Sequence, residues 1–147
     1  MRSTYVALAR LVALGVIVQA ALIAFGWFEV LSEVEDGAVF DENTDYNAGQ
    51  LLHAMVGTIV IPVISLVLLV LSFFAKIPGG VKWAAIIFGL VVLQFLLALV
   101  SFSAPVIGLL HGMNALALAI VAERAGARVA ALAPTTGPEQ PRTTAPA

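Results

Sequence analysis

The chain contains two histidines, and both lie in one short apolar pattern that occurs twice. His53 lies in residues 51–55 (LLHAM) and His111 in residues 109–113 (LLHGM), each about six residues into a long apolar run. An ionisable side chain is costly in lipid, so it marks a functional site whose partner has to be named. We therefore take these histidines as the candidate site and expect them to face each other in a membrane bundle.

Two imidazoles at one level on facing helices are the axial ligands that a b-type haem requires. The flat macrocycle also needs room beside each helix, and small residues share the face of each histidine because they lie three or four positions away. These small residues are Gly49 and Gly57 around His53, and Gly108 and Ala115 around His111. The pattern predicts one haem b whose iron binds His53 and His111.

The same small residues also predict close helix packing that needs no cofactor. The histidines would then be hydrogen-bonded core residues, and with haem the same partners would instead fix the histidine tautomer. The candidate partners are Gln19, Gln94, Gln50 and Asn114. A metal or quinone site is a third alternative, although two imidazoles alone are an incomplete zinc site because structural zinc takes four ligands.

The composition predicts a membrane protein. Of the 147 residues 61% are hydrophobic and 11% are charged, whereas a soluble domain has about 25% charged residues. Cysteine is absent, which excludes disulfides, thiolate metal sites, iron–sulfur clusters and covalently attached c-type haem. The length corresponds to one domain.

Apolar runs predict an all-α fold, a four-transmembrane-helix bundle over residues 1–124. The predicted spans are 5–28, 48–75, 83–102 and 105–122. At about 1.5 Å per residue the first of these can cross a hydrocarbon core of about 30 Å. The first run exceeds the roughly 7–15 apolar residues of a signal peptide and ends in aromatic residues, so we expect a retained span. Pro62 is expected to kink the second span.

The connecting segments predict the orientation. Residues 29–47 form an acidic loop with seven carboxylates, whose irregular spacing favours a solvated loop over a calcium site. All seven basic residues lie at the N-terminus, in the turn at 76–82 or after the fourth span. The positive-inside rule then places both termini in the cytoplasm and the chain in the inner membrane. Residues 125–147 are expected to be a flexible tail.

The two halves of the chain read as parallel repeats related by an axis along the membrane normal. In each half, a span with one central glutamine precedes a span with the histidine pattern: Gln19 before His53, and Gln94 before His111. Both histidines should lie about 9 Å below the outer surface, with the glutamines roughly one turn deeper.

This layout resembles one half of haem A synthase-type proteins and, more broadly, cytochrome b561-like four-helix haem proteins. Residues 52–57 (LHAMVG) and 110–115 (LHGMNA) are also similar to small bacterial membrane families of this shape. The resemblance covers residues 5–124 and implies axial ligation by His53 and His111. A two-haem, four-histidine cytochrome is excluded by the histidine count, and haem A synthase catalysis is not expected of a single four-span bundle.

The first functional hypothesis is a small haem protein for electron transfer or haem handling, not an enzyme on its own, with a membrane redox partner. The alternative is a cofactor-free accessory or assembly subunit of a larger membrane complex. Both place the chain in the lipid bilayer and neither involves nucleic acid. Transport is less favoured, because no acidic residue lies inside a span to couple ions. No outer-side Arg or Lys is available for haem propionates, which would face water or helix N-termini.

Overall fold

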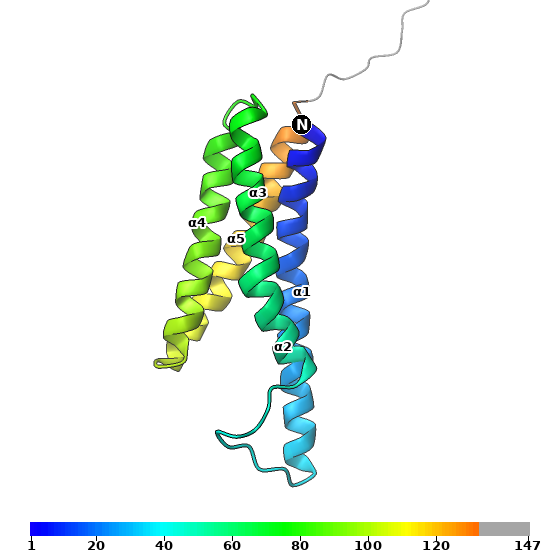
Figure 1. The fold of residues 1–147 in the computed structure, drawn as a ribbon, viewed down its shortest axis with the longest axis vertical. Helices are drawn as coiled ribbons and strands as arrows, with labels where there is room; N and C mark the ends of the chain where they lie inside the picture. Colours follow the sequence, from blue (N-terminus) through cyan, green and yellow to red (C-terminus); the bar gives the residue numbers. More distant parts are fainter. Residues whose placement is uncertain (133–147) are drawn as a thin grey trace, which may run out of the picture.

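A computed structural model describes residues 1–132 (Figure 1), and within this range the chain forms helices and loops without strands. The helical elements in chain order are α1 (Arg2–Glu35), α2 (Ala48–Met55), the π-helical turn η1 (Val56–Val60), α3 (Ile61–Phe74), α4 (Gly80–Ser101), the 3-10 turn η2 (Pro105–Ile107) and α5 (Gly108–Ala130). Elements α2, η1 and α3 run on as one helix, and so do η2 and α5.

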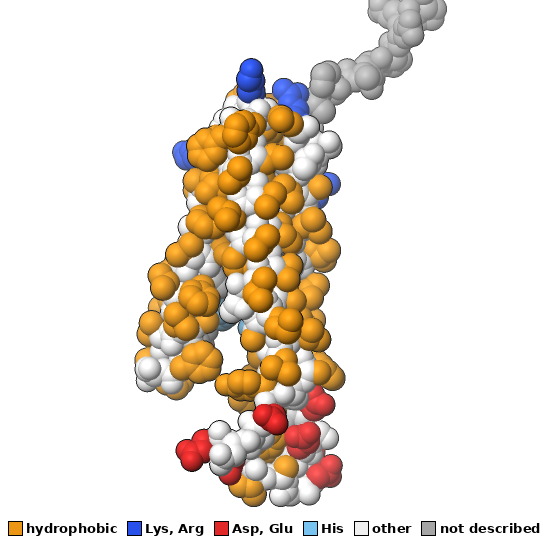
Figure 2. Space-filling view, viewed as in Figure 1, with side chains coloured by type: hydrophobic (Ala, Val, Ile, Leu, Met, Phe, Trp, Pro, Cys, Tyr) orange, Lys and Arg blue, Asp and Glu red, His pale blue; other side chains and the backbone are white. Residues whose placement is uncertain are grey.

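The four continuous helices that result within the described residues are each long and apolar enough to cross a membrane. They comprise Arg2–Glu35, Ala48–Phe74, Gly80–Ser101 and Pro105–Ala130. At most 28% of the most apolar stretch of any span is buried inside the protein, and Figure 2 shows hydrophobic side chains over most of the outer surface. An apolar surface of this extent requires lipid around it. The prediction of an all-α protein with four spans is confirmed, and the chain is a small integral membrane protein.

Two helices extend beyond their predicted ends. Helix α1 continues through the first acidic residues to Glu35, and α5 continues past Glu123 and Arg124 to Ala130. Charged residues end a membrane-embedded segment but not a helix, because Glu, Arg and Ala are all good helix formers. Residues 125–130 of the predicted flexible tail are therefore helical, and the part of that tail from 133 onward lies outside the described residues.

The core lies between α1, α3, α4 and α5. Its fully buried side chains include Tyr5, Val12, Leu68, Ile87 and Leu118. The hydroxyl of Tyr5 donates a hydrogen bond of 2.9 Å to the backbone carbonyl of Gly80, which ties the start of α1 to the start of α4. This buried bond fixes the relative height of two spans at the end where the chain begins.

The two ends of the bundle differ in charge. The N-terminus, the α3–α4 turn and the C-terminal end of α5 lie at one end (Figure 1), and the guanidinium of Arg2 donates to the carbonyl of Leu132 at 3.0 Å. Figure 2 shows Lys and Arg at this end and Asp and Glu at the other. We call these the basic end and the acidic end.

Pro62 follows a local change in helix winding. The backbone widens just before it into the π-helical turn η1, in which the Ile61 N–H bonds the Val56 carbonyl five residues back. Proline has no N–H and clashes with the preceding turn, and a π turn accommodates one extra residue without interrupting the helix. His53 therefore lies at the end of α2 nearest this turn.

Toward the acidic end the bundle divides into two arms. Helix α2 packs chiefly against α1, while α4 packs against α5, and the two pairs diverge in Figure 1. The space-filling view in Figure 2 shows an opening between the arms, with mainly hydrophobic walls and histidine atoms at its inner end.

Candidate functional site

The two histidines lie close together where the arms join. His53 extends from α2 and His111 from α5, and their ring centroids are 6.4 Å apart with the ring planes inclined at 59°. Both rings are partly buried. Two residues that are far apart in the sequence thus form one site at the inner end of the opening.

Each histidine bonds the backbone of the glutamine in the preceding span. The Nδ1 of His53 lies 3.0 Å from the carbonyl oxygen of Gln19, and the Nδ1 of His111 lies 3.1 Å from that of Gln94. A carbonyl oxygen can only accept, so both Nδ1 atoms carry the proton in these bonds. The two halves of the chain use the same contact to hold the two rings.

The Nε2 atoms of the two rings differ in their surroundings. The Nε2 of His111 lies 3.0 Å from the side-chain Nε2 of Gln94, which also donates to the His111 carbonyl at 3.0 Å. The amide nitrogen is a donor, so His111 Nε2 accepts, consistent with a proton on Nδ1. His111 is therefore assigned as the Nδ1–H tautomer from these bonds, and the bond to Gln19 places a proton on Nδ1 of His53 as well.

The side chains of the two glutamines also differ. Gln94 is fully engaged, because its Oε1 accepts from the Asn114 side chain at 2.6 Å while its Nε2 donates to His111. Gln19 is 8% exposed, and its Nε2 has no hydrogen-bond partner among the described residues. A buried unpaired amide donor is costly, so the first half of the site has one unsatisfied donor next to His53.

The small residues predicted to flank a cofactor have different surroundings. A Cβ at Gly49 would lie 2.5 Å from the Gly26 nitrogen, and one at Gly57 would lie 3.1 Å from Gln19 Oε1. These two glycines therefore allow α1 to approach α2 closely. A Cβ at Gly108 would touch only Ser101 Oγ, at 3.9 Å, and Ala115 packs against the hydrophobic core.

Sequence reasoning missed the anchor at the start of α2. The Asn47 Oδ1 accepts from the Gln50 N–H, the Gln50 Oε1 accepts from the Asn47 N–H, and the Asn47 Nδ2 donates to the Gly26 carbonyl at 2.8 Å. The first two bonds form a capping box, which an Asn-x-x-Gln sequence before an apolar run can indicate. Gln50 is thus a capping residue and not a histidine partner.

The remaining amide candidate, Asn114, supports the site indirectly. Its Nδ2 donates to the Leu90 carbonyl at 3.0 Å as well as to Gln94. Within residues 1–132 no group of three or more His, Asp or Glu side chains is placed to hold a metal ion. The site therefore offers two imidazole nitrogens and no further charged ligand.

No family model, curated protein or solved structure matches the chain.

Proposed function

We propose that this membrane protein binds one b-type haem between His53 and His111 and uses it for electron transfer or haem handling. The observation that carries the proposal is the 6.4 Å separation of the ring centroids. An imidazole nitrogen binds a metal at about 2.0 Å, and with the ring centre about 1.1 Å behind it, two opposed ligands have centres about 6.2 Å apart.

The tautomers support the same assignment. In proteins, a metal-binding histidine commonly donates its other ring N–H to a carbonyl or carboxylate, which fixes the ring and makes the ligating nitrogen more basic. The Nδ1 bonds to the carbonyls of Gln19 and Gln94 have this form. With these Nδ1 bonds in place, the Nε2 atom of each ring is the one that would bind the iron.

The opening between the arms supplies the room that a macrocycle needs. Its walls are mainly hydrophobic (Figure 2), which suits an apolar porphyrin. Ligation by His111 requires Gln94 Nε2 to release the ring nitrogen that it now bonds. The side-chain amide of Gln94 would therefore move when haem binds.

Two axial histidines leave the iron no open position, so electron transfer fits better than oxygen chemistry. We infer that the protein is not an enzyme on its own and works with a redox partner in the membrane. The basic end, with both termini, would face the cytoplasm by the positive-inside rule, and the protein would lie in the inner membrane. The two halves would be parallel repeats that each contribute one ligand.

The test is the absorption spectrum of the full chain purified in detergent after expression with ample haem. A Soret band is expected in the wild type and in Thr58→Val, a control five residues after His53 whose hydroxyl bonds the Ala54 carbonyl. The band should be lost in His53→Ala combined with His111→Ala. Absence of a band in the wild type, or a band that survives the double substitution, would refute haem binding by these residues.

A cofactor-free accessory subunit is the second candidate, and the contact between α1 and α2 favours it. The approach of Gly49 to the Gly26 backbone is the close packing that small residues provide in membranes. In that case the histidines tie spans together through the carbonyls of Gln19 and Gln94. His53→Ala would then lower stability or the yield of a stoichiometric partner complex without any spectral change.

A further inference from the structure

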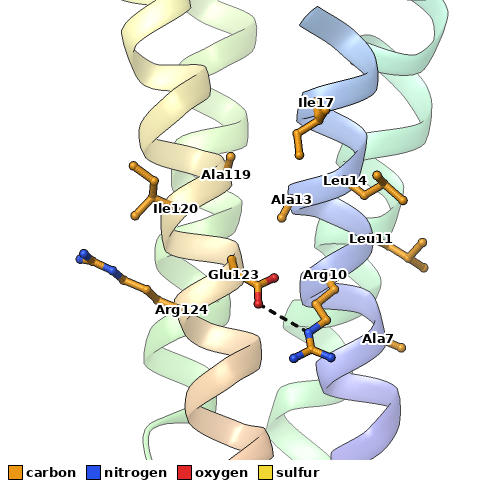
Figure 3. Close-up of a pocket in the computed structure, with 10 residues that line it drawn as sticks. All are labelled: Ala7, Arg10, Leu11, Ala13, Leu14, Ile17, Ala119, Ile120, Glu123 and Arg124. Atoms are coloured by element: carbon orange, nitrogen blue, oxygen red, sulfur yellow. Dashed lines mark ion pairs between the residues drawn. The ribbon is translucent and has the colours of Figure 1, made fainter. Parts of the chain in front are cut away.

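A groove separate from the histidine site runs between α1 and α5 near the basic end. Its volume is about 870 Å³. Ala13 and Ala119 lie at its centre, and the larger side chains of Leu14, Ile17 and Ile120 border it (Figure 3). The small central residues let an elongated apolar group lie between the two helices.

One end of the groove is apolar and the other is charged. Arg10 and Glu123 point toward each other across it in Figure 3, with Nε and Oε1 3.6 Å apart. Arg124 extends from the neighbouring position of α5 on the side away from α1. Arg10 and Glu123 are each about half exposed, at 54% and 55%. Two guanidinium groups and one carboxylate leave this end with a net positive charge.

The positive region continues toward the start of the chain. A second hollow of about 470 Å³ shares Arg10 and Ala7 with the groove and reaches Arg2 near the end of α5. Three arginines therefore line the two hollows, with Glu123 as the one carboxylate among the lining residues.

The depth of the charged end matches that of lipid headgroups. Arg10 directly precedes the uncharged run 11–28, so it lies where the apolar part of α1 begins. From Arg10 to Ile17 the groove runs about 10 Å along the helix at 1.5 Å per residue, which lies within one leaflet of a hydrocarbon core about 30 Å thick. Arginine side chains can extend along apolar surface to place their charge at the headgroup level.

We propose that this groove binds one anionic phospholipid, with an acyl chain along Ala13 and Ala119 and the phosphate at Arg10 and Arg124. The occupant follows from charge: an apolar channel whose charged end carries two guanidinium groups and one carboxylate is net positive there and matches an acyl chain joined to an anionic headgroup. Basic pockets between membrane helices bind such headgroups, and guanidinium groups can bind phosphate oxygens bidentately. The flexible side chain of Arg124 would fold over the headgroup.

The experiment is native mass spectrometry of the full chain in detergent with dioleoyl phosphatidylglycerol or dioleoyl phosphatidylcholine. These probes differ in headgroup charge but not in acyl chains. The wild type should retain one phosphatidylglycerol in preference to phosphatidylcholine. Each arginine near the membrane surface contributes about five-fold to anionic lipid binding, so Arg10→Gln with Arg124→Gln should lower the preference by about 25-fold.

Two further variants keep the test specific. Lys76→Gln with Lys82→Gln removes the same charge from the α3–α4 turn at the same end and should leave the preference unchanged. Glu123→Gln removes the groove's carboxylate and should raise phosphatidylglycerol retention, an effect opposite to that of the arginine variant. If the arginine variant does not fold, Arg10→Lys with Arg124→Lys keeps the charge and should retain the preference.

Three outcomes would overturn the proposal. The wild type could retain both lipids equally. Alternatively, Lys76→Gln with Lys82→Gln could lose as much preference as Arg10→Gln with Arg124→Gln. Finally, the groove could be filled by a second copy. In the last case the spectra would show a dimer whose abundance does not depend on added lipid.

Discussion

Gln94 forms hydrogen bonds to both ring nitrogens of His111. The Gln94 backbone carbonyl lies 3.1 Å from His111 Nδ1, and the Gln94 side-chain Nε2 lies 3.0 Å from His111 Nε2. Gln19 makes only the first of these contacts, to His53 at 3.0 Å. The side chain of Gln94 therefore occupies the nitrogen that would bind a metal, and that of Gln19 does not.

Gln94→Leu should tighten haem binding by about five-fold, because ligation no longer has to break a hydrogen bond worth about 1 kcal/mol. The carbonyl that orients His111 Nδ1 remains, and Asn114 keeps its bond to the Leu90 carbonyl. Haem titration followed at the Soret band measures the change. Gln19→Leu is the matched control and should not tighten binding. Weaker binding in Gln94→Leu, or equal effects of both substitutions, would contradict this role.

Gly49→Ala should destabilise the protein by about 1–3 kcal/mol, because overpacking forces a backbone shift. The added methyl would lie 2.5 Å from the Gly26 nitrogen. Gly112→Ala is the matched control in the second copy of the histidine pattern, where an added Cβ meets nothing within 4 Å. It should be neutral or stabilising by up to about 1 kcal/mol from helix propensity. Reversible denaturation in mixed micelles measures both, and equal effects would show that α1 and α2 do not pack this closely.

Tyr5→Phe should lower the free energy of unfolding by about 0.5–1.5 kcal/mol. It removes the buried 2.9 Å hydrogen bond to the Gly80 carbonyl while keeping the ring in the core. Tyr46→Phe is the control, because Tyr46 is 64% exposed in the acidic loop. The same denaturation experiment applies, and a loss as large in Tyr46→Phe would rule out a specific contribution from the Tyr5 bond.

The acidic loop should respond to pH through Asp41. The Asn43 N–H donates to its carboxylate at 2.8 Å, and this bond, assisted by Thr44, lowers the pKa of Asp41 below its usual value. Because the pKa is lower in the folded loop, the turn is stabilised above the unfolded pKa and loses that contribution as pH falls through the folded pKa. Carboxyl carbon NMR shifts report the titration. In Thr44→Val the pKa should move toward its usual value, and an Asp41 pKa at or above the usual value in the wild type would contradict the bond.

The four spans could be predicted because each apolar run matches the bilayer thickness. Their ends could not, because the acidic residues before Glu35 and the pair Glu123–Arg124 leave the apolar layer without ending the helix. Hydropathy reports the solvent around a segment, whereas the end of a helix depends on local propensity and capping.

The candidate site could be predicted in part. Two histidines at matched positions indicated a pair, and Gln19 and Gln94 were among the expected partners. The histidines, however, bond the backbone carbonyls of these glutamines, and every residue has a carbonyl, so no side-chain pattern indicates which one is used. Helical spacing predicted that Gly49 and Gly57 lie on the same helix face as His53. Whether that face contacts a cofactor or α1 depends on how the spans pack, which the spacing does not determine.

The π-helical turn at Val56–Val60 sets the direction in which His53 points. An α-helix turns about 100° per residue, and a π turn accommodates one additional residue. If the same residues were wound as a regular α-helix, without the wider turn, α2 would rotate about its axis by roughly 100° relative to α3. The imidazole would then be carried around the helix, away from His111. The meeting of the two rings thus depends on the wider winding of this turn, which lies directly before Pro62.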